Sequence, residues 1–227
     1  MTQKSEKIQR SFVREEAYLK LRNWIVEGRL EPGQKLRDKD LAQQMGVSRT
    51  PIREALLRLE EEGLIQTKPN SSTLVCPIDS HNALHLFSIV WSLEKLALEQ
   101  AFTSITTKDI QTMIEANEKL SQALQHEDLL AALQADITFH AAYIYLAHNP
   151  DLERILSNLK QKLRRLDLYY FEKVKEAHRS YDEHQLIIEA LQQKDLPGAL
   201  SAIENNWKAS LSRIYQQQKP IKPKEKK

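Results

Sequence analysis

Cysteine, glycine and proline are all scarce in this 227-residue sequence, which contains one Cys, five Gly and eight Pro. Cys76 alone cannot form an intramolecular disulfide, which is typical of a protein from a reducing compartment. So few glycines and prolines cannot supply the many tight turns of an all-β protein. Stretches rich in Leu, Ala, Glu, Lys and Gln are common instead, so the composition predicts a mainly helical fold.

The sequence also lacks a continuous apolar run near the ~18 residues that a membrane span needs. The N-terminal stretch MTQKSEKIQR is polar and has no apolar secretory core. We therefore expect a cytoplasmic protein without a membrane partner. The net charge is only +2, but residues 1–76 carry 14 basic against 11 acidic side chains, and residues 77–218 carry 14 against 19. This division favours nucleic acid as a partner of the first part.

The first 76 residues have the order of elements found in a winged helix-turn-helix. Ser48 is a favourable N-cap residue, and Pro51 falls in a first helical turn, where its missing N–H costs little. Asn70 can adopt the left-handed turn that joins two short strands into a wing. Apolar spacing and turn residues predict helices over 11–27, 39–45 and 48–62, and strands over 64–68 and 73–76.

Only helical periodicity is found between about residues 83 and 216. A cap residue stands near each of the breaks at Thr106, Asn149 and Asp195. The predicted helices span about 83–103, 107–126, 128–147, 151–178, 179–194 and 196–216. The fold class is therefore mainly α, with an N-terminal winged helix-turn-helix followed by an all-helical antiparallel bundle of about six helices. The expected domains are 1–76 for DNA binding, 77–82 as a linker, 83–216 as the bundle, and 217–227 as a disordered basic tail.

Two arginines stand one helical turn apart near the start of the third predicted helix. Arg49 and Arg53 project from one face and are presented at the helix start together with Ser48 and Thr50, whereas Ile52 and its apolar neighbours occupy the other side. In a helix-turn-helix the start of the second helix meets base edges in the major groove, and the arginine fork fits guanine O6 and N7. The alternative is that both arginines are ordinary solvated surface charges. The preceding turn, the cap and the following hairpin favour contact with DNA.

A second group of polar residues lies on the predicted inward faces of the bundle. Asp136 and His140 are four residues apart on one helix, and His184 lies on the apolar face of another. Burying these groups without partners costs several kcal/mol for the charge. A metal ion would satisfy all three. An Asp–His hydrogen bond beside an unrelated core histidine is the alternative reading, and periodicity alone favours it.

The run LAQQMGVSRTPIREALLRLEEEGLI resembles the winged-helix head of GntR-type bacterial transcription regulators over about residues 12–76. The segment VSRTPIREAL is a specific match. The resemblance implies phosphate or base contacts from the head, including the wing tip. The residues so implied are Arg37, Lys39, Arg49, Thr50, Arg53 and, at the tip, Asn70. The family often has glycines at this tip, where this chain has Asn70-Ser71-Ser72.

The helical segment of about residues 81–216 looks like the effector-binding FCD domain of FadR-type GntR regulators. The resemblance implies a divalent metal of the zinc, nickel or manganese type, with Asp136, His140 and the His184 of Glu183-His184 as ligands. The family's histidine on the last helix corresponds to Asn206, whose carbonyl oxygen is a weaker ligand for zinc-like ions.

Family members often carry an effector-binding arginine three residues before the glutamate that is Glu94 here, and this chain has Trp91 in that place. Arg164 and Arg165 are candidates for a replacement cation in an effector pocket.

The resemblance implies a ligand-responsive repressor and not an enzyme. Its partners are then a double-stranded, palindromic DNA operator, a small-molecule effector such as an organic acid, and a second copy of the chain in a homodimer. The alternative is a metal-dependent hydrolase with an accessory DNA-binding head, since three protein ligands leave a metal position open. The sequence shows no clear nucleophile–base arrangement in support of that alternative.

Overall fold

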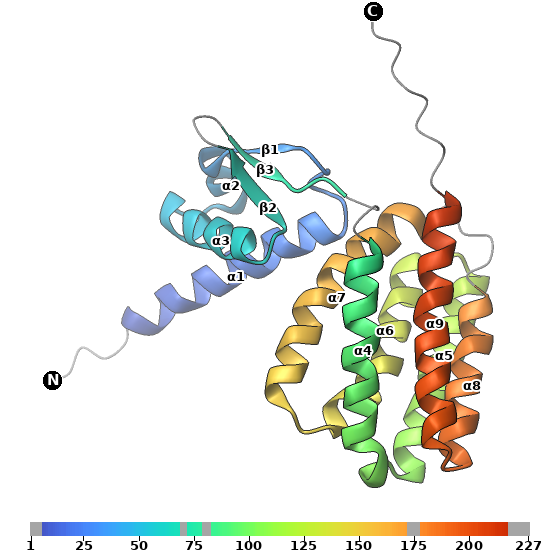
Figure 1. The fold of residues 1–227 in the computed structure, drawn as a ribbon. Helices are drawn as coiled ribbons and strands as arrows, with labels where there is room; N and C mark the ends of the chain where they lie inside the picture. Colours follow the sequence, from blue (N-terminus) through green and yellow to red (C-terminus); the bar gives the residue numbers. More distant parts are fainter. Residues whose placement is uncertain (1–5, 69–71, 79–82, 172–177, 218–227) are drawn as a thin grey trace, which may run out of the picture. The chain divides into compact units, whose positions relative to one another are not determined.

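The computed structural model describes residues 6–68, 72–78, 83–171 and 178–217. The chain divides into two compact units, Met1–Ile78 and Asp79–Lys227, which we call the head and the bundle (Figure 1). Both consist mostly of helices, as the composition predicts. Asn70, the predicted wing-tip residue, lies outside the described residues.

The head contains three helices, α1 (Glu6–Val26), α2 (Asp38–Met45) and α3 (Arg49–Glu61). Helix α1 begins before residue 11, because the preceding residues favour a helix although they show no apolar spacing. Gly46 ends α2 with a φ of 68°, a left-handed conformation that glycine adopts at little cost. Leu21, Ile52 and Leu59 are completely buried, so the apolar faces of α1 and α3 meet in the core of the head.

Three short strands complete the head: β1 (Lys35–Leu36), β2 (Ile65–Lys68) and β3 (Ser72–Val75). They form an antiparallel sheet in the order β1-β3-β2, with Leu36 opposite Thr73. The predicted hairpin is therefore present, and it gains a third strand that two residues are too few to reveal as a sequence pattern.

The bundle begins with α4 (Ala83–Ala101) and a short 3-10 helix, η1 (Phe102–Ser104). It continues with α5 (Thr107–Gln125), α6 (Leu129–Leu146), α7 (Pro150–Phe171), α8 (Arg179–Gln192) and α9 (Leu196–Gln217). The predicted cap residues act at three helix starts: the side chains of Thr106, Asn149 and Asp195 accept hydrogen bonds from backbone N–H groups of α5, α7 and α9. The fold class predicted from the sequence is confirmed.

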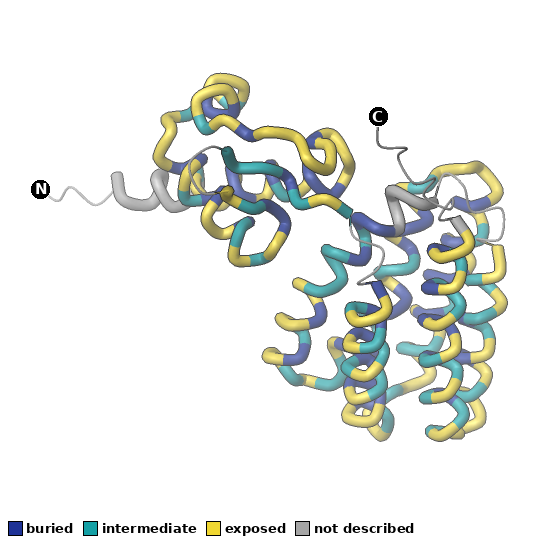
Figure 2. The backbone as a smooth tube through the Cα atoms, turned by 45° about the horizontal axis from the view of Figure 1, so that its top comes forward, coloured by how far each residue is buried: buried dark blue, intermediate teal, exposed yellow. Residues whose placement is uncertain are grey.

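Buried stripes run along the inner faces of the bundle helices (Figure 2). Helix α5 packs against α6 and α8, and α9 packs against α8 and α4. The interior holds large apolar side chains such as Phe87 and Phe139, but also several polar ones. The buried polar residues of the described chain are Glu94, Asn117, His140, Arg165, His184 and Asn206. The candidate metal site includes two of these buried polar residues, His140 and His184.

Helix α6 has the length and apolar composition of a membrane span, with a mean hydropathy of 1.2. It is the one such helix among the described residues, and core helices of soluble proteins pass the same test. It packs against α5, α4 and α7 and carries His140 on its buried side. Its contacts with these three helices bury part of its apolar surface within the bundle.

Candidate nucleic-acid interface and candidate metal centre

Helix α3 separates its side chains into a buried face and an exposed face. Ile52 and Leu59 face the head core, while Arg49 and Arg53 keep 54% and 61% of their side-chain surface exposed. Ser48 stands at the N-cap position, but its side chain makes no capping hydrogen bond. The predicted capping bond is therefore absent, and the exposed Ser48 hydroxyl is not used by the helix start.

Both arginines are tied to one carboxylate that the sequence did not single out. Arg49 donates from Nε and Nη2 to Asp38 at 2.9–3.2 Å, and Arg53 donates from Nε to Asp38 Oδ2 at 2.6 Å. Hydrogen bonds from Arg53 and Arg49 lower the pKa of Asp38 from its usual value, so the carboxylate is ionised at neutral pH. Asp38, the first residue of α2, thus links that helix to the exposed face of α3.

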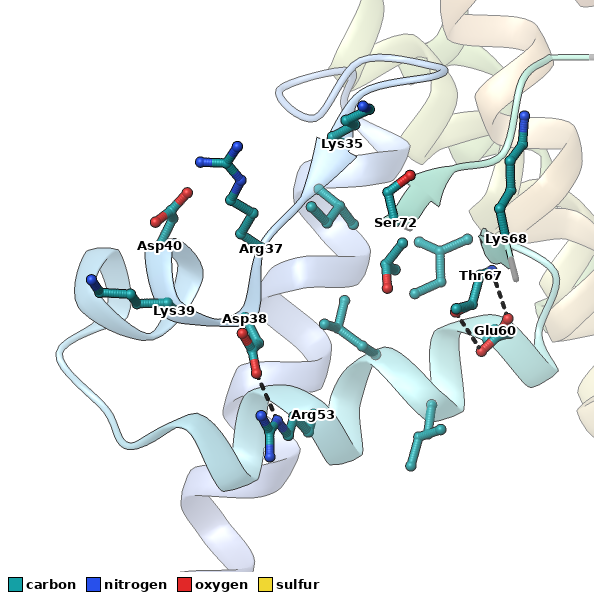
Figure 3. A pocket seen from close by; sticks show the side chains of 15 residues that line it. Lys35, Arg37, Asp38, Lys39, Asp40, Arg53, Glu60, Thr67, Lys68 and Ser72 are labelled. Atoms are coloured by element: carbon teal, nitrogen blue, oxygen red, sulfur yellow. Dashed lines mark hydrogen bonds and ion pairs between the residues drawn. The ribbon is translucent and has the colours of Figure 1, made fainter. Parts of the chain in front are cut away.

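A groove of about 890 Å³ lies between α2, α3 and the sheet (Figure 3). Cationic side chains from each of these elements line it, and they outnumber its carboxylates, Asp38, Asp40 and Glu60. The cations are Lys35, Arg37, Lys39, Arg53 and Lys68. Arg37 precedes α2 and Lys39 lies in its first turn, and both are exposed. Thr50 is exposed at the start of α3. The described head therefore presents its predicted DNA-binding residues on its exposed surface, next to a basic groove.

The bundle brings together three of the four predicted metal ligands. The ligand atoms of Asp136, His140 and His184 lie within 4.8 Å of one another. Asp136 Oδ1 is 3.5 Å from His184 Nε2 and 3.9 Å from His140 Nε2. Both imidazoles are buried, while Asp136 keeps about a third of its side chain exposed.

The remaining ring nitrogens of the two histidines are held by side chains behind them. Asn117 donates through Nδ2 to the Tyr181 carbonyl, so its Oδ1 accepts from His184 Nδ1 at 3.0 Å. His184 Nδ1 then carries the proton, and Nε2 keeps a free lone pair. That buried Nε2 has no hydrogen-bond partner. Burial, followed by the charge of His140, lowers the pKa of His184 well below its usual value. A neutral imidazole with an unpartnered nitrogen fits a metal ligand.

Glu94 of α4 holds the second histidine and joins four helices. Its carboxylate accepts from Nδ1 of His140 and from Tyr143 on α6, from Lys160 on α7, and from Nε1 of Trp207 on α9. Burial alone would raise the pKa of Glu94, but the charges of His140 and Lys160 hold it well below its usual range. Glu94 therefore stays ionised in the core because a lysine and three hydrogen-bond donors surround it.

Asn206, the fourth predicted ligand, makes a different contact. Its Nδ2 donates to Glu183 Oε2 at 3.0 Å, and Glu183 is paired with Arg213 at 2.6 Å. The amide thus belongs to an ion-pair network between α8 and α9. This contact occupies the amide nitrogen of Asn206, and Asp136, His140 and His184 form the group of acidic and histidine side chains that could hold a metal ion.

The predicted effector residues lie on α4 and α7. Trp91 is half-buried on α4, with Lys208 Nζ 5.7 Å from its ring centre. On α7, Arg165 is buried and Arg164 is half-buried. The positive charges that act on Asp136 include those of His140, Lys160 and Arg213.

Sequence reasoning missed Glu94 and Lys160, although one signal was available. Glu94 occupies the apolar stripe of α4 that also contains Val90, Ala97 and Ala101. A glutamate on such a stripe is rarely buried without a partner. The helical spacing could therefore have marked it as a buried charge, whereas its partner on α7 could not be read from local spacing.

Comparisons with known proteins match both parts of the chain. Residues 13–75 match the bacterial regulatory proteins of the gntR family, and residues 85–208 match the FCD domain. The HTH-type transcriptional regulator McbR of Escherichia coli is 27% identical over 199 residues, which are 87% of this chain and 90% of McbR. The HTH-type transcriptional repressor RspR of E. coli is 27% identical over 183 residues, 81% of this chain and 80% of RspR.

The solved structure of E. coli McbR/YncC superposes with a TM-score of 0.79 at 26% identity. The alignment covers 90% of this chain and 98% of that structure.

Proposed function

Because the chain belongs to the GntR family of bacterial transcription regulators, of the FadR type with an FCD domain, we propose that it is a ligand-responsive repressor. In this proposal a homodimer binds a palindromic operator through its two heads. A divalent metal and a small organic ligand in the bundle then set the affinity for that operator. The cytoplasm is the compartment in which such a protein meets its operator.

The observation that carries the proposal is the pair of exposed arginines at the start of α3. Arg49 and Arg53 project from the helix that enters the major groove in winged helix-turn-helix proteins, and the adjacent groove is basic. In this proposal Arg37, Lys39 and Lys68, which line the groove, contact phosphates, and such contacts position a protein on DNA without reading its sequence. Ser48 and Thr50 add exposed polar groups at the same helix start.

The bundle supports a metal-assisted ligand site. Asp136, together with Nε2 of His140 and of His184, would hold the ion, and the unpartnered Nε2 of His184 fits that role. A divalent metal there would supply a Lewis-acidic position for an oxygen of the ligand. Lys160 and Arg213 add positive charge near Asp136, which favours an anionic ligand such as an organic acid. Asn206 remains a weak fourth ligand in this proposal, and Trp91, Arg164 and Arg165 remain candidates for the effector pocket.

Repression and dimerisation rest on different supports. The similar RspR is named a repressor, which favours repression over activation. A two-fold operator matches two heads, which favours a dimer. A ligand can change the affinity for DNA only if its own affinity differs between two arrangements of the dimer. The family consists of regulators, so the hydrolase alternative is set aside.

The test begins with the full-length protein and a library of random DNA duplexes. Rounds of selection should enrich one palindromic sequence, and sedimentation of the complex should show two chains on one duplex. Repeating the titration with EDTA-treated protein, and then with manganese, nickel or zinc and a panel of small organic acids, should change the affinity for that sequence. A protein that enriches no sequence under any of these conditions is not the regulator proposed.

A further inference from the structure

Asp38 holds the two candidate base-reading arginines at once. Arg49 meets the carboxylate along one edge of its guanidinium, with Nη2 at 3.0 Å from Oδ1 and 2.9 Å from Oδ2. Arg53 meets the same carboxylate through Nε alone, at 2.6 Å from Oδ2 (Figure 3). Asp38, which lies on α2, therefore fixes the two guanidinium groups of α3 relative to each other.

These contacts leave at least one terminal nitrogen of each guanidinium free of Asp38. Arg49 uses Nε and Nη2, and Nη2 reaches both oxygens of Asp38, so its Nη1 is the nitrogen that remains free of the carboxylate. Arg53 uses only Nε, so both of its terminal nitrogens remain free of Asp38. In Arg53 the terminal edge is a two-nitrogen fork that can bond O6 and N7 of guanine together.

The exposure of the three side chains shows which way the group faces. Asp38 keeps 22% of its side chain exposed, against 54% for Arg49 and 61% for Arg53. The protein therefore covers the Asp38 side chain more than it covers either arginine. Asp38 is the first residue of α2, where an acidic group also suits the helix dipole.

We propose that Asp38 is a positioning residue for sequence reading, which orients Arg49 and Arg53 toward guanine and at the same time weakens binding to non-specific DNA. This inference rests on the proposed function of the head. Long arginine side chains lose conformational freedom when they bind, and side chains already held in place lose less of it. The negative charge also repels phosphates, which supply most of non-specific affinity.

The test compares Asp38→Asn with Asp40→Asn in the full-length protein. Asp40 lies in the same first turn of α2, is exposed and lines the same groove, so its variant removes an equal charge from nearly the same place. The probes are the duplex that the wild-type protein selects from a random library and an unrelated duplex of equal length. A third probe replaces the guanines of the selected duplex with 7-deazaguanine, which lacks N7.

We expect Asp38→Asn to lower the ratio of specific to non-specific affinity by about tenfold, similar to one mismatched base pair. The penalty for 7-deazaguanine should shrink in the same variant, because mobile arginines bond N7 less well. Asp40→Asn should tighten binding to both duplexes alike and leave the ratio unchanged. Asp38→Glu keeps the charge but moves the carboxylate, so it should lose specific affinity without gaining non-specific affinity.

An unchanged ratio in Asp38→Asn, or equal tightening on both duplexes, would overturn the inference and make Asp38 a simple electrostatic mask. Circular dichroism of each variant ensures that only folded proteins are compared, and Asp38→Glu carries the test if Asp38→Asn does not fold. Failure of the wild-type protein to select any duplex would instead overturn the proposed function, and this inference with it.

Discussion

In the head, Arg49 and Arg53 keep more than half of their side-chain surface exposed, whereas in the bundle Glu94, His140 and His184 keep almost none. The exposed charges share a single surface carboxylate. The buried ones are held by specific donors and acceptors on five helices, α4, α5, α6, α7 and α9.

The difference indicates where each region meets its partner. A charge that stays in water can meet a large external partner through the atoms that its ion pair leaves open, and exposed pairs contribute little to stability. A buried charge has lost its water, so its neighbours must compensate for it. Substitutions should therefore affect DNA binding in the head and folding or ligand binding in the bundle.

The largest effect should come from Glu94→Ala. Lys160 is mostly buried and would lose its counter-ion, so we expect the free energy of unfolding to fall by about 3–5 kcal/mol, as when one partner of a buried pair is removed. Urea unfolding followed by circular dichroism measures this change. The control is Glu204→Ala, because Glu204 is also paired with lysine, in this case Lys95 and Lys208, but is more exposed than Glu94. A similar loss in the control would contradict the contrast between buried and exposed pairs.

Metal binding should give the next largest effect. Metal at one hundred times its dissociation constant should stabilise the bundle by about 2.7 kcal/mol, because it binds only the folded state. Thermal unfolding of EDTA-treated protein, with and without manganese, nickel or zinc, measures this shift. Asp136→Asn and His184→Gln should abolish it. His126→Gln, a change at an exposed histidine at the end of α5, should leave it intact. Equal shifts in all three variants would mean that the metal binds elsewhere.

Substitution of the arginines should have a smaller effect, confined to DNA binding. Arg49→Ala and Arg53→Ala should each weaken binding to the selected duplex by about 1–3 kcal/mol if the lost contact is bidentate. Their unfolding free energies should change by no more than about 0.5 kcal/mol. Fluorescence anisotropy and urea unfolding measure the two quantities. Arg154 of α7 is at least as exposed as either arginine, and Arg154→Ala should leave DNA affinity unaltered.

The smallest effect should follow from Lys68→Ala at the edge of the basic groove. A phosphate contact carries no sequence information, so affinity should fall about equally for selected and unrelated duplexes. The slope of log affinity against log salt should decrease by about 1. Titrations at four salt concentrations measure this slope. A change in sequence preference would mean that Lys68 reads bases and does not only position the head.

Local sequence patterns were sufficient for most of the fold. Helix periods, glycine stops and the caps at Thr106, Asn149 and Asp195 are short-range features, and each acts within a few residues. The strand β1 escaped prediction because its two residues pair with a strand that is far away in the sequence. Its existence depends on the closed head and not on any pattern of its own.

The candidate sites were predictable only where their residues follow one helix. Asp136 and His140 are one turn apart, so their proximity could be inferred from spacing. The bond from Asn206 to Glu183 and the tie from Asp38 to the arginines cross between helices. Such contacts depend on how the helices pack against each other, and a single sequence does not reveal that packing.

The short strand β1 has a mechanical consequence for the head. Its register fixes Leu36 opposite Thr73 in the wing, and Asp38 follows only two residues later. A duplex that pushed the wing aside would drag the carboxylate along and change the angle at which both guanidinium groups meet the bases. Contact of the wing with the DNA backbone and the sequence preference of the arginines would then change together.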